Sequence, residues 1–264
     1  MKDYLEINKN SWNAKVDYHL KSDFYFVEEF IAGRTSLNEP ELKLLGNIKD
    51  KKILHLQCHF GQDSISLARM GAEVTAVDLS DKAIAEAKIL ANKCGVEVNF
   101  IESDVYNLPK VLEDKFDIVF TSYGTIGWLP DLEKWAKVIL HFLKKGGKFI
   151  FVEFHPVVWM FDDDFTKIAY DYSSKEPIVE TYEGTYADRN AEISQQYVMW
   201  NHSLADVFQS LINENLEIKT FEELDWSPYA CFKHTVEYEK GKFRINALEK
   251  KIPLVYKLTA LRNI

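Results

Sequence analysis

Apolar runs of six or seven residues alternate with helical segments from residue 51 onward, and this alternation restricts the fold more than any other feature. The runs lie at 52–57, 73–78, 96–101, 116–122 and 148–154. Strand and helix patterns at such intervals predict β-α-β units and a parallel sheet. Because the runs are continuously apolar, we expect helices to cover both faces of that sheet.

Capping residues separate the runs. The predicted helices cover 63–70, 81–93, 132–143 and 204–214, and two further strands are predicted at 216–224 and 253–261. Ser80 is a predicted N-cap, and Gly71 and Gly95 stand where two of these helices should end. Gly146 and Gly147 are expected to close the helix over 132–143.

The composition favours an ordinary folded protein. At roughly 150 residues per domain, 264 residues give one large domain, or one domain with an insertion. A hydrophobic fraction of 47% and three widely spaced cysteines argue against a disordered chain and a disulfide scaffold. The net charge of −9 argues against a nucleic-acid partner. Acidic residues near Met1 and the lack of a long apolar stretch predict a cytoplasmic protein with no membrane segment.

The chain divides into four predicted parts. These are an N-terminal helical segment or lid over 1–50, a core over 51–155, an insertion of hairpins over 156–200 and a completion of the sheet over 201–264. Trp12, Tyr18 and His19 in the first part are candidates for a lid over a ligand; the alternative is a helix packed on the body through its aromatics. Trp159 and Trp200 are candidate substrate contacts in the insertion.

Polar residues follow the first four predicted strands, where parallel sheets bind their ligands. The first strand leads into a turn with one glycine, Gly61. Asp78 ends the second strand, where an acid can accept hydrogen bonds from a ribose; a capping or surface aspartate is the alternative. Asp104 and Val105 follow the third strand and could contact an adenine, unless Asp104 is a plain loop acid. Ser122, Tyr123 and Gly124 follow the fourth.

These residues together resemble the class I S-adenosylmethionine-dependent methyltransferases, most clearly over 50–155. The chain is similar to a bacterial subgroup with the loop L-H-L-Q-C-H-F-G-Q-D, a tryptophan seven residues before a histidine (Trp12 and His19), F-T-S-Y-G after strand four and H-P after strand five. The resemblance implies a doubly wound, Rossmann-like α/β fold. Its sheet would be seven-stranded and mostly parallel, with an antiparallel last strand.

The resemblance also implies a set of cofactor contacts. The residues at matching positions are Gln57, Cys58, His59, Phe60, Gly61, Gln62, Asp63, Asp78, Leu79, Asp104, Val105, Ser122 and Tyr123. The family's first motif has an acid followed by alternating glycines. Here His55, Gln57 and His59 depart from it. Gln57 and His59 are expected to present backbone groups from the β region or to add side-chain contacts.

Methyl transfer from S-adenosylmethionine, with S-adenosylhomocysteine as product, is an in-line displacement that depends mainly on positioning. A base is needed only if the acceptor must lose a proton. The candidates are His155, Tyr123 and Glu153, with His155 preferred because its free pKa lies near neutrality. The alternative for His155 is a capped loop histidine before Pro156.

A metal site is not expected. His55, Cys58 and His59 offer fewer ligands than a closed zinc site requires, and we predict a buried cysteine beside loop histidines. The predicted function is methyl transfer to a small, partly apolar acceptor rather than a phosphate ester, by a monomer or homodimer. The alternatives are a catalytically inactive cofactor-binding or interaction protein and a nucleotide-dependent oxidoreductase. The glycine-rich turn that the oxidoreductase needs is absent from the sequence.

Overall fold

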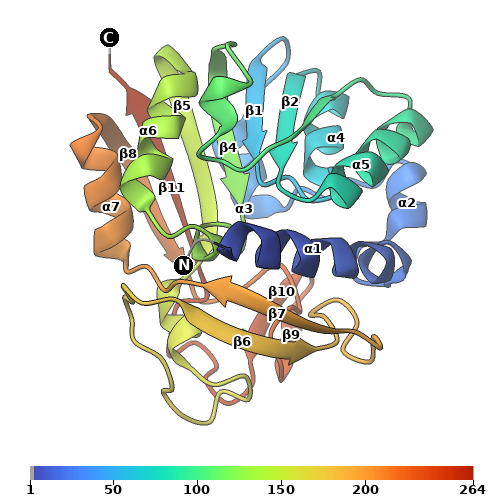
Figure 1. The fold of residues 1–264 in the computed structure, drawn as a ribbon, viewed down its shortest axis with the longest axis vertical. Helices are drawn as coiled ribbons and strands as arrows, with labels where there is room; N and C mark the ends of the chain where they lie inside the picture. Colours follow the sequence, from blue (N-terminus) through green and yellow to red (C-terminus); the bar gives the residue numbers. More distant parts are fainter. Residues whose placement is uncertain (1–2, 264) are drawn as a thin grey trace.

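The computed structural model describes residues 3–263 and is built around a seven-stranded sheet of order β3-β2-β1-β4-β5-β11-β8 (Figure 1). Its strands are β1 (Lys52–Leu56), β2 (Glu73–Asp78), β3 (Asn99–Glu102), β4 (Phe116–Ser122), β5 (Leu143–Phe154), β8 (Leu216–Leu224) and β11 (Val255–Arg262). The first five pair in parallel, and β11 pairs antiparallel with both β5 and β8. The predicted doubly wound sheet with an antiparallel last strand is confirmed.

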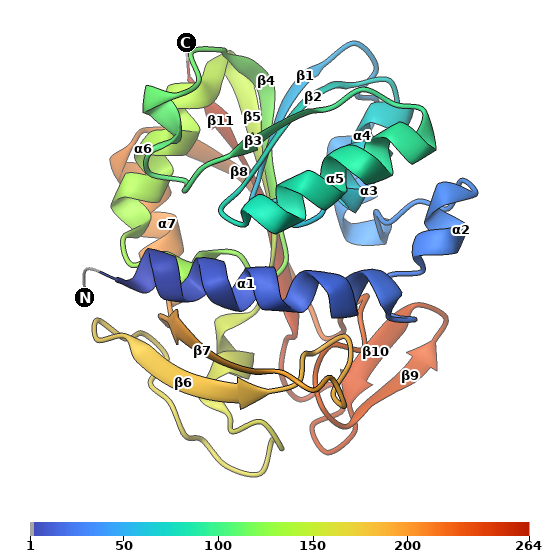
Figure 2. The same ribbon diagram turned by 45° about the vertical axis from the view of Figure 1, so that its right-hand side comes forward.

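Helices cover both faces of this sheet (Figure 2). They are α1 (Tyr4–Lys21), α2 (Val27–Ile31), α3 (Glu39–Leu45), α4 (Gln62–Arg69), α5 (Asp81–Cys94), α6 (Leu132–Phe142) and α7 (Leu204–Asn213), with short 3₁₀ turns η1 (Leu108–Lys110), η2 (Ile126–Trp128) and η3 (Pro156–Met160). Side chains of β5 alternate between the two faces. Phe149 and Phe151 pack into the cluster formed with α6 and α7, and Ile150 packs into the opposite cluster with α4 and α5.

Local capping positions α5 as predicted. The Ser80 hydroxyl accepts the Ala83 N–H at 3.0 Å, and Gly95 ends the helix in the left-handed conformation at φ 65°. The prediction that Gly146 and Gly147 close the preceding helix is wrong. Helix α6 ends at Phe142, and both glycines lie inside β5, where the pairing with β4 shifts register.

Two antiparallel hairpins lie beyond the carboxyl edge of the sheet. The first consists of β6 (Ile178–Glu183) and β7 (Ser194–Met199), within the predicted insertion. The second consists of β9 (Thr235–Glu239) and β10 (Lys242–Ile245), which the sequence did not predict as strands. Helix α1 runs between the sheet and the first hairpin in both ribbon views (Figures 1 and 2).

One side chain links α1 to the first hairpin. The buried Asn8 donates from Nδ2 to the Val198 carbonyl at 2.9 Å and accepts the Val198 N–H at Oδ1 at 2.9 Å. The amide of Asn8 therefore pairs with β7 as a neighbouring strand would. Helix α1 also reaches α5, because Asn13 donates to Asp81 at 2.9 Å.

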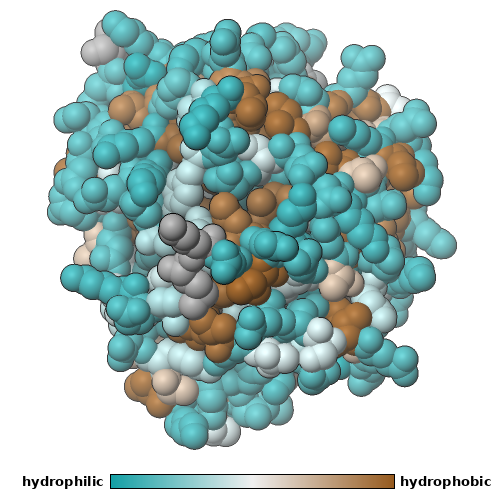
Figure 3. Space-filling model, viewed as in Figure 1, coloured by the Kyte–Doolittle hydropathy of each residue, from teal (hydrophilic) through white to brown (hydrophobic). Residues whose placement is uncertain are grey.

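The face in Figure 3 is mostly hydrophilic, with smaller hydrophobic patches between the polar side chains. Among the helices of residues 3–263, none combines the length and the apolar character needed to cross a membrane.

Candidate active site

A cavity of about 880 Å³ lies at the carboxyl ends of the parallel strands, and α1 and both hairpins contribute to its walls. All the residues that the sequence nominated for cofactor contact line it. They are Gln57, Cys58, His59, Phe60, Gly61, Gln62, Asp63, Asp78, Leu79, Asp104, Val105, Ser122 and Tyr123. The fold therefore gathers segments from four separate strand ends around one space, as the parallel topology requires.

The loop after β1 uses the left-handed conformation three times. Gln57 has φ 56°, His59 has φ 50° and Gly61 has φ 82°. Two of the three departures from the family motif, Gln57 and His59, therefore keep the backbone that glycine favours, and the expected β-region backbone is wrong. Gln57 does add a side-chain contact, because its Nε2 donates to the Thr125 carbonyl at 2.8 Å. At Gly61 a side chain has no room, since a Cβ would lie 2.7 Å from the Phe100 ring.

Asp78 fixes the shape of this loop. Its Oδ2 accepts the His59 N–H at 2.8 Å, and its Oδ1 accepts the Ser80 N–H at 2.9 Å. Burial raises the pKa of Asp78. Asp104, at the end of β3, accepts the N–H groups of Tyr106 at 3.0 Å and Asn107 at 3.1 Å through Oδ1. Both carboxylates thus hold turns at the cavity wall through backbone hydrogen bonds.

Helix α1 meets this loop through two histidines. His19 Nδ1 lies 2.8 Å from His59 Nε2, and the Trp12 ring lies edge-on to His59 with 5.3 Å between centroids. Burial lowers the pKa of His19 to about 2 and that of His59 to about 3, so both rings are neutral at physiological pH. Trp12 lines the cavity, whereas Tyr18 and His19 do not. Trp159 and Trp200, the two tryptophans nominated in the insertion, line the cavity as well.

Sequence reasoning missed Lys15, which also lines the cavity from α1. Only 7% of this residue is exposed, and its Nζ lies 4.5 Å from the centroid of the Trp12 ring and 5.4 Å from that of Trp128. Burial lowers the pKa of Lys15 to about 8, which leaves the amine mostly protonated at pH 7. The helical spacing of Trp12, Lys15 and His19 is the sequence pattern that could have found it.

Glu41 was missed as well. It lies on α3, is fully buried, and its Oε2 accepts the Tyr123 hydroxyl at 2.7 Å. The other oxygen accepts the Asn38 N–H at 2.8 Å, which completes a capping box at the start of α3. Burial raises the pKa of Glu41 to about 7. Tyr123 lines the cavity, and its own backbone is left-handed at φ 48°. The hydrogen bond between Tyr123 and Glu41 therefore joins the cavity wall to a buried proton acceptor.

The other two nominated bases have structural roles. Glu153 accepts N–H groups from Gly124, from Thr125 at 2.7 Å and from Phe154 at 2.7 Å, so its carboxylate holds the loop after β4. His155, the preferred base, does not line the cavity. Its Nδ1 accepts the Val157 N–H at 3.2 Å and its Nε2 lies 2.8 Å from Glu223, so it caps the turn as the alternative interpretation expected.

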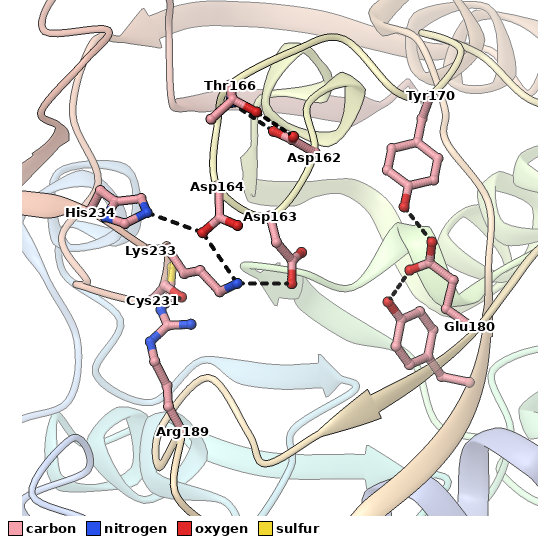
Figure 4. Close-up of polar contacts among 11 residues, drawn as sticks. Asp162, Asp163, Asp164, Thr166, Tyr170, Glu180, Arg189, Cys231, Lys233 and His234 are labelled. Carbon is pink, nitrogen blue, oxygen red and sulfur yellow. Dashed lines mark hydrogen bonds and ion pairs between the residues drawn. The ribbon is translucent and has the colours of Figure 1, made fainter.

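Further polar side chains in and around the cavity are paired with one another or buried. His55 Nδ1 lies 2.8 Å from the Ser64 hydroxyl, and Cys58 is buried. Figure 4 shows a rim cluster in which Asp164 faces His234 and Lys233, and a separate pair of tyrosines on Glu180. Within the part of the chain that the structure describes, no group of three or more His, Cys, Asp or Glu residues could hold a metal ion.

Comparison with known proteins agrees with this geometry. Residues 53–147 match the family model described as a methyltransferase domain. An uncharacterized protein from Haemophilus influenzae is 25% identical, over 80% of this chain and 87% of its own length. The ubiquinone biosynthesis O-methyltransferase of Azotobacter vinelandii is 30% identical, over 56% of this chain, and the match spans 62% of that enzyme.

A crystal structure shares the fold. It is that of an S-adenosylmethionine-dependent methyltransferase from Clostridium acetobutylicum, with a TM-score of 0.58 at 16% identity, over 97% of this chain and 99% of the other. The protein thus has the fold of the class I S-adenosylmethionine-dependent methyltransferases.

Proposed function

We propose that this protein transfers a methyl group from S-adenosylmethionine to a small-molecule acceptor. The observation that carries the proposal is the left-handed loop after β1, which Asp78 ties to the end of β2 inside the cavity. The methyltransferase domain match over residues 53–147 supports the same activity.

The residues present fit the cofactor. Asp78 would accept hydrogen bonds from the ribose, and Asp104 and Val105 would contact the adenine. Helix α4 begins at Gln62, and the free N–H groups of its first turn would receive the methionine carboxylate. The buried Gln57 Oε1 has no hydrogen-bond partner within residues 3–263, and an ammonium group would satisfy it. When bound, the cofactor supplies a methyl group already activated by its sulfonium.

The protein's own part is positioning and, for a hydroxyl acceptor, removal of a proton. We assign that proton to Tyr123, whose hydroxyl would accept it while passing its own proton to Glu41 Oε2. The phenol stays neutral throughout, and the negative charge of Glu41 is lost as the methyl group is transferred. This path avoids ionising Tyr123, whose pKa burial raises well above its usual value.

Calorimetric titration with S-adenosylmethionine and S-adenosylhomocysteine tests the proposal. We expect Kd values in the micromolar range, on the order of −8 kcal/mol of binding free energy. Asp78→Ala should weaken both by about tenfold or more, whereas Asp114→Ala, an exposed acid outside the cavity, should leave them unchanged. If neither ligand binds, the proposal fails. Binding with no turnover across a broad acceptor screen would instead indicate a cofactor-binding protein.

A further inference from the structure

Lys15 is a buried cation inside the cavity. Its ammonium group lies beside two rings that contact each other, 4.5 Å from the centroid of Trp12 on its own helix and 5.4 Å from that of Trp128 on η2. Aromatic faces attract a cation, but such contacts replace only part of the hydration that burial removes. The side chain therefore needs a further partner to be fully satisfied.

No residue in the described part of the chain supplies a negative charge to it. Burial is the one cause that lowers the pKa of Lys15, and no carboxylate among residues 3–263 forms an ion pair with it. The nearby His19 and His59 are neutral and bonded to each other. The arrangement is one that a bound anion would complete.

Three acids of the cavity wall are already engaged elsewhere. Asp78 accepts two backbone N–H groups, and Asp63 accepts the hydroxyls of Ser36 at 2.6 Å and Ser122 at 3.2 Å. Glu153 accepts the N–H groups of the loop after β4. No ion pair to Lys15 forms within residues 3–263, so a bound ligand can supply the negative charge.

We propose that Lys15 binds the carboxylate of the methyl acceptor, and that the acceptor is an aromatic acid. The proposal rests on the methyltransferase function above. The aromatic part follows from the walls near the amine, because Trp12, Trp128 and Tyr197 all line the cavity. The centroid of the Trp128 ring lies 5.2 Å from that of Trp12 and 6.0 Å from that of Tyr197. Such walls favour a flat ring beside the charge.

The cofactor's own carboxylate is a second source of the same chemistry. We favour the acceptor because Lys15 lies against η2, after β4, whereas the first turn of α4 follows β1. The two sources give different results in one experiment.

Tryptophan fluorescence can report the site, because the Trp12 and Trp128 rings both lie close to the amine. Benzoate and its neutral counterpart benzamide are titrated into protein loaded with S-adenosylhomocysteine and into unloaded protein. We expect benzoate to bind about tenfold or more tightly than benzamide. Lys15→Met should abolish that preference, Lys15→Arg should retain it, and Lys21→Met, at the exposed end of α1, should not alter it.

Three outcomes would overturn the proposal or its parts. Equal binding of benzoate and benzamide by the wild type would remove the anion site. A preference that survives Lys15→Met would place the anion elsewhere. A loss of about tenfold in S-adenosylhomocysteine affinity in Lys15→Met would assign Lys15 to the cofactor's carboxylate instead. If the wild type fails to bind S-adenosylhomocysteine, the methyltransferase function fails, and the titration of unloaded protein still decides whether Lys15 binds an anion.

Discussion

The Tyr123 hydroxyl donates to Glu41 Oε2 at 2.7 Å, which couples a cavity-lining phenol to a buried carboxyl whose pKa is raised to about 7. We expect the protonated carboxyl band of Glu41 in infrared difference spectra to disappear with a midpoint near pH 7, and Glu41→Gln to lack that band. With a hydroxyl acceptor, kcat should rise across the same pH range. Glu41→Gln should lower kcat by roughly 100-fold with little effect on KM, and an unchanged pH profile in that variant would exclude the relay.

The same carboxyl should also lower stability as the pH rises. Its pKa in the folded protein lies above the unfolded value of 4.5, so its contribution is fully present below pH 4.5 and is lost as the pH rises through about 7. The difference between the folded and unfolded pKa values corresponds to roughly 3 kcal/mol of unfolding free energy. Urea unfolding at pH 5 and pH 8 should show the wild type losing about that much relative to Glu41→Gln. Parallel losses in the two proteins would contradict the raised pKa.

Lys15→Met should stabilise the ligand-free protein. The folded pKa of Lys15, about 8, lies below its ordinary value of 10.5, so the charged amine costs roughly 3 kcal/mol at pH 7. Wild-type stability should therefore rise as the pH increases from 8 toward 10.5, and that rise should be missing in Lys15→Met. The measurement is the melting temperature at pH 7 and pH 9.5. A melting temperature that falls in Lys15→Met at pH 7 would show that the amine is already paired.

Acid should destabilise the protein through His19 and His59. Both pKa values are lower in the folded protein than the unfolded 6.5, so their contribution is present above pH 6.5 and is lost as the pH falls toward 3. When the pH falls from 7 to 5, each histidine should lower the free energy of unfolding by about 2 kcal/mol. His19→Gln removes one of the two, so its loss on acidification should be smaller by that amount. Denaturant unfolding at the two pH values checks this, and equal losses in both proteins would refute it.

Gly61→Ala should be strongly destabilising, by about 3 kcal/mol or more. Residue 61 has a left-handed backbone, φ 82°, which side chains rarely adopt. The added Cβ would also lie 2.7 Å from the Phe100 ring and 3.0 Å from the Ala87 side chain. Gly95→Ala is a matched control, because it has φ 65° with nothing within 4 Å of the new Cβ. That change should cost only about 1 kcal/mol. Similar melting temperatures for the two variants would contradict the steric cause.

Local patterns predicted the parallel strands and the polar residues at their ends, whereas the antiparallel last strand and the full set of cofactor contacts were implied by the family resemblance. Strands β2 and β4 match their predicted bounds, because apolar runs and capping residues are local signals. The shared location of Asp78 and Asp104 was predicted because each follows a parallel strand, and parallel strands bring their carboxyl ends to one edge of the sheet. Gly146 and Gly147 were misplaced because glycines fit a register shift within a strand as well as a helix end.

Side-chain roles depended on contacts that the sequence does not reveal. Glu41 and Lys15 come from segments outside the recognised core, and only tertiary packing buries them beside the cavity. His155 was preferred for its intrinsic pKa, but the turn at Pro156 directs its ring toward Glu223. Chemical suitability could be judged from residue type, whereas the direction of a side chain depended on the hydrogen bonds of its loop.

The two hydrogen bonds between Asn8 and Val198 have a consequence for ligand traffic. Helix α1 packs against strand β7, and the buried amide of Asn8 adds two hydrogen bonds to that packing, so the two elements separate only if both bonds break. A movement that lifts α1 from the loop after β1 should therefore carry the hairpin with it. We expect cofactor exchange and product departure to proceed through one common opening step, whose frequency would set the upper limit on turnover.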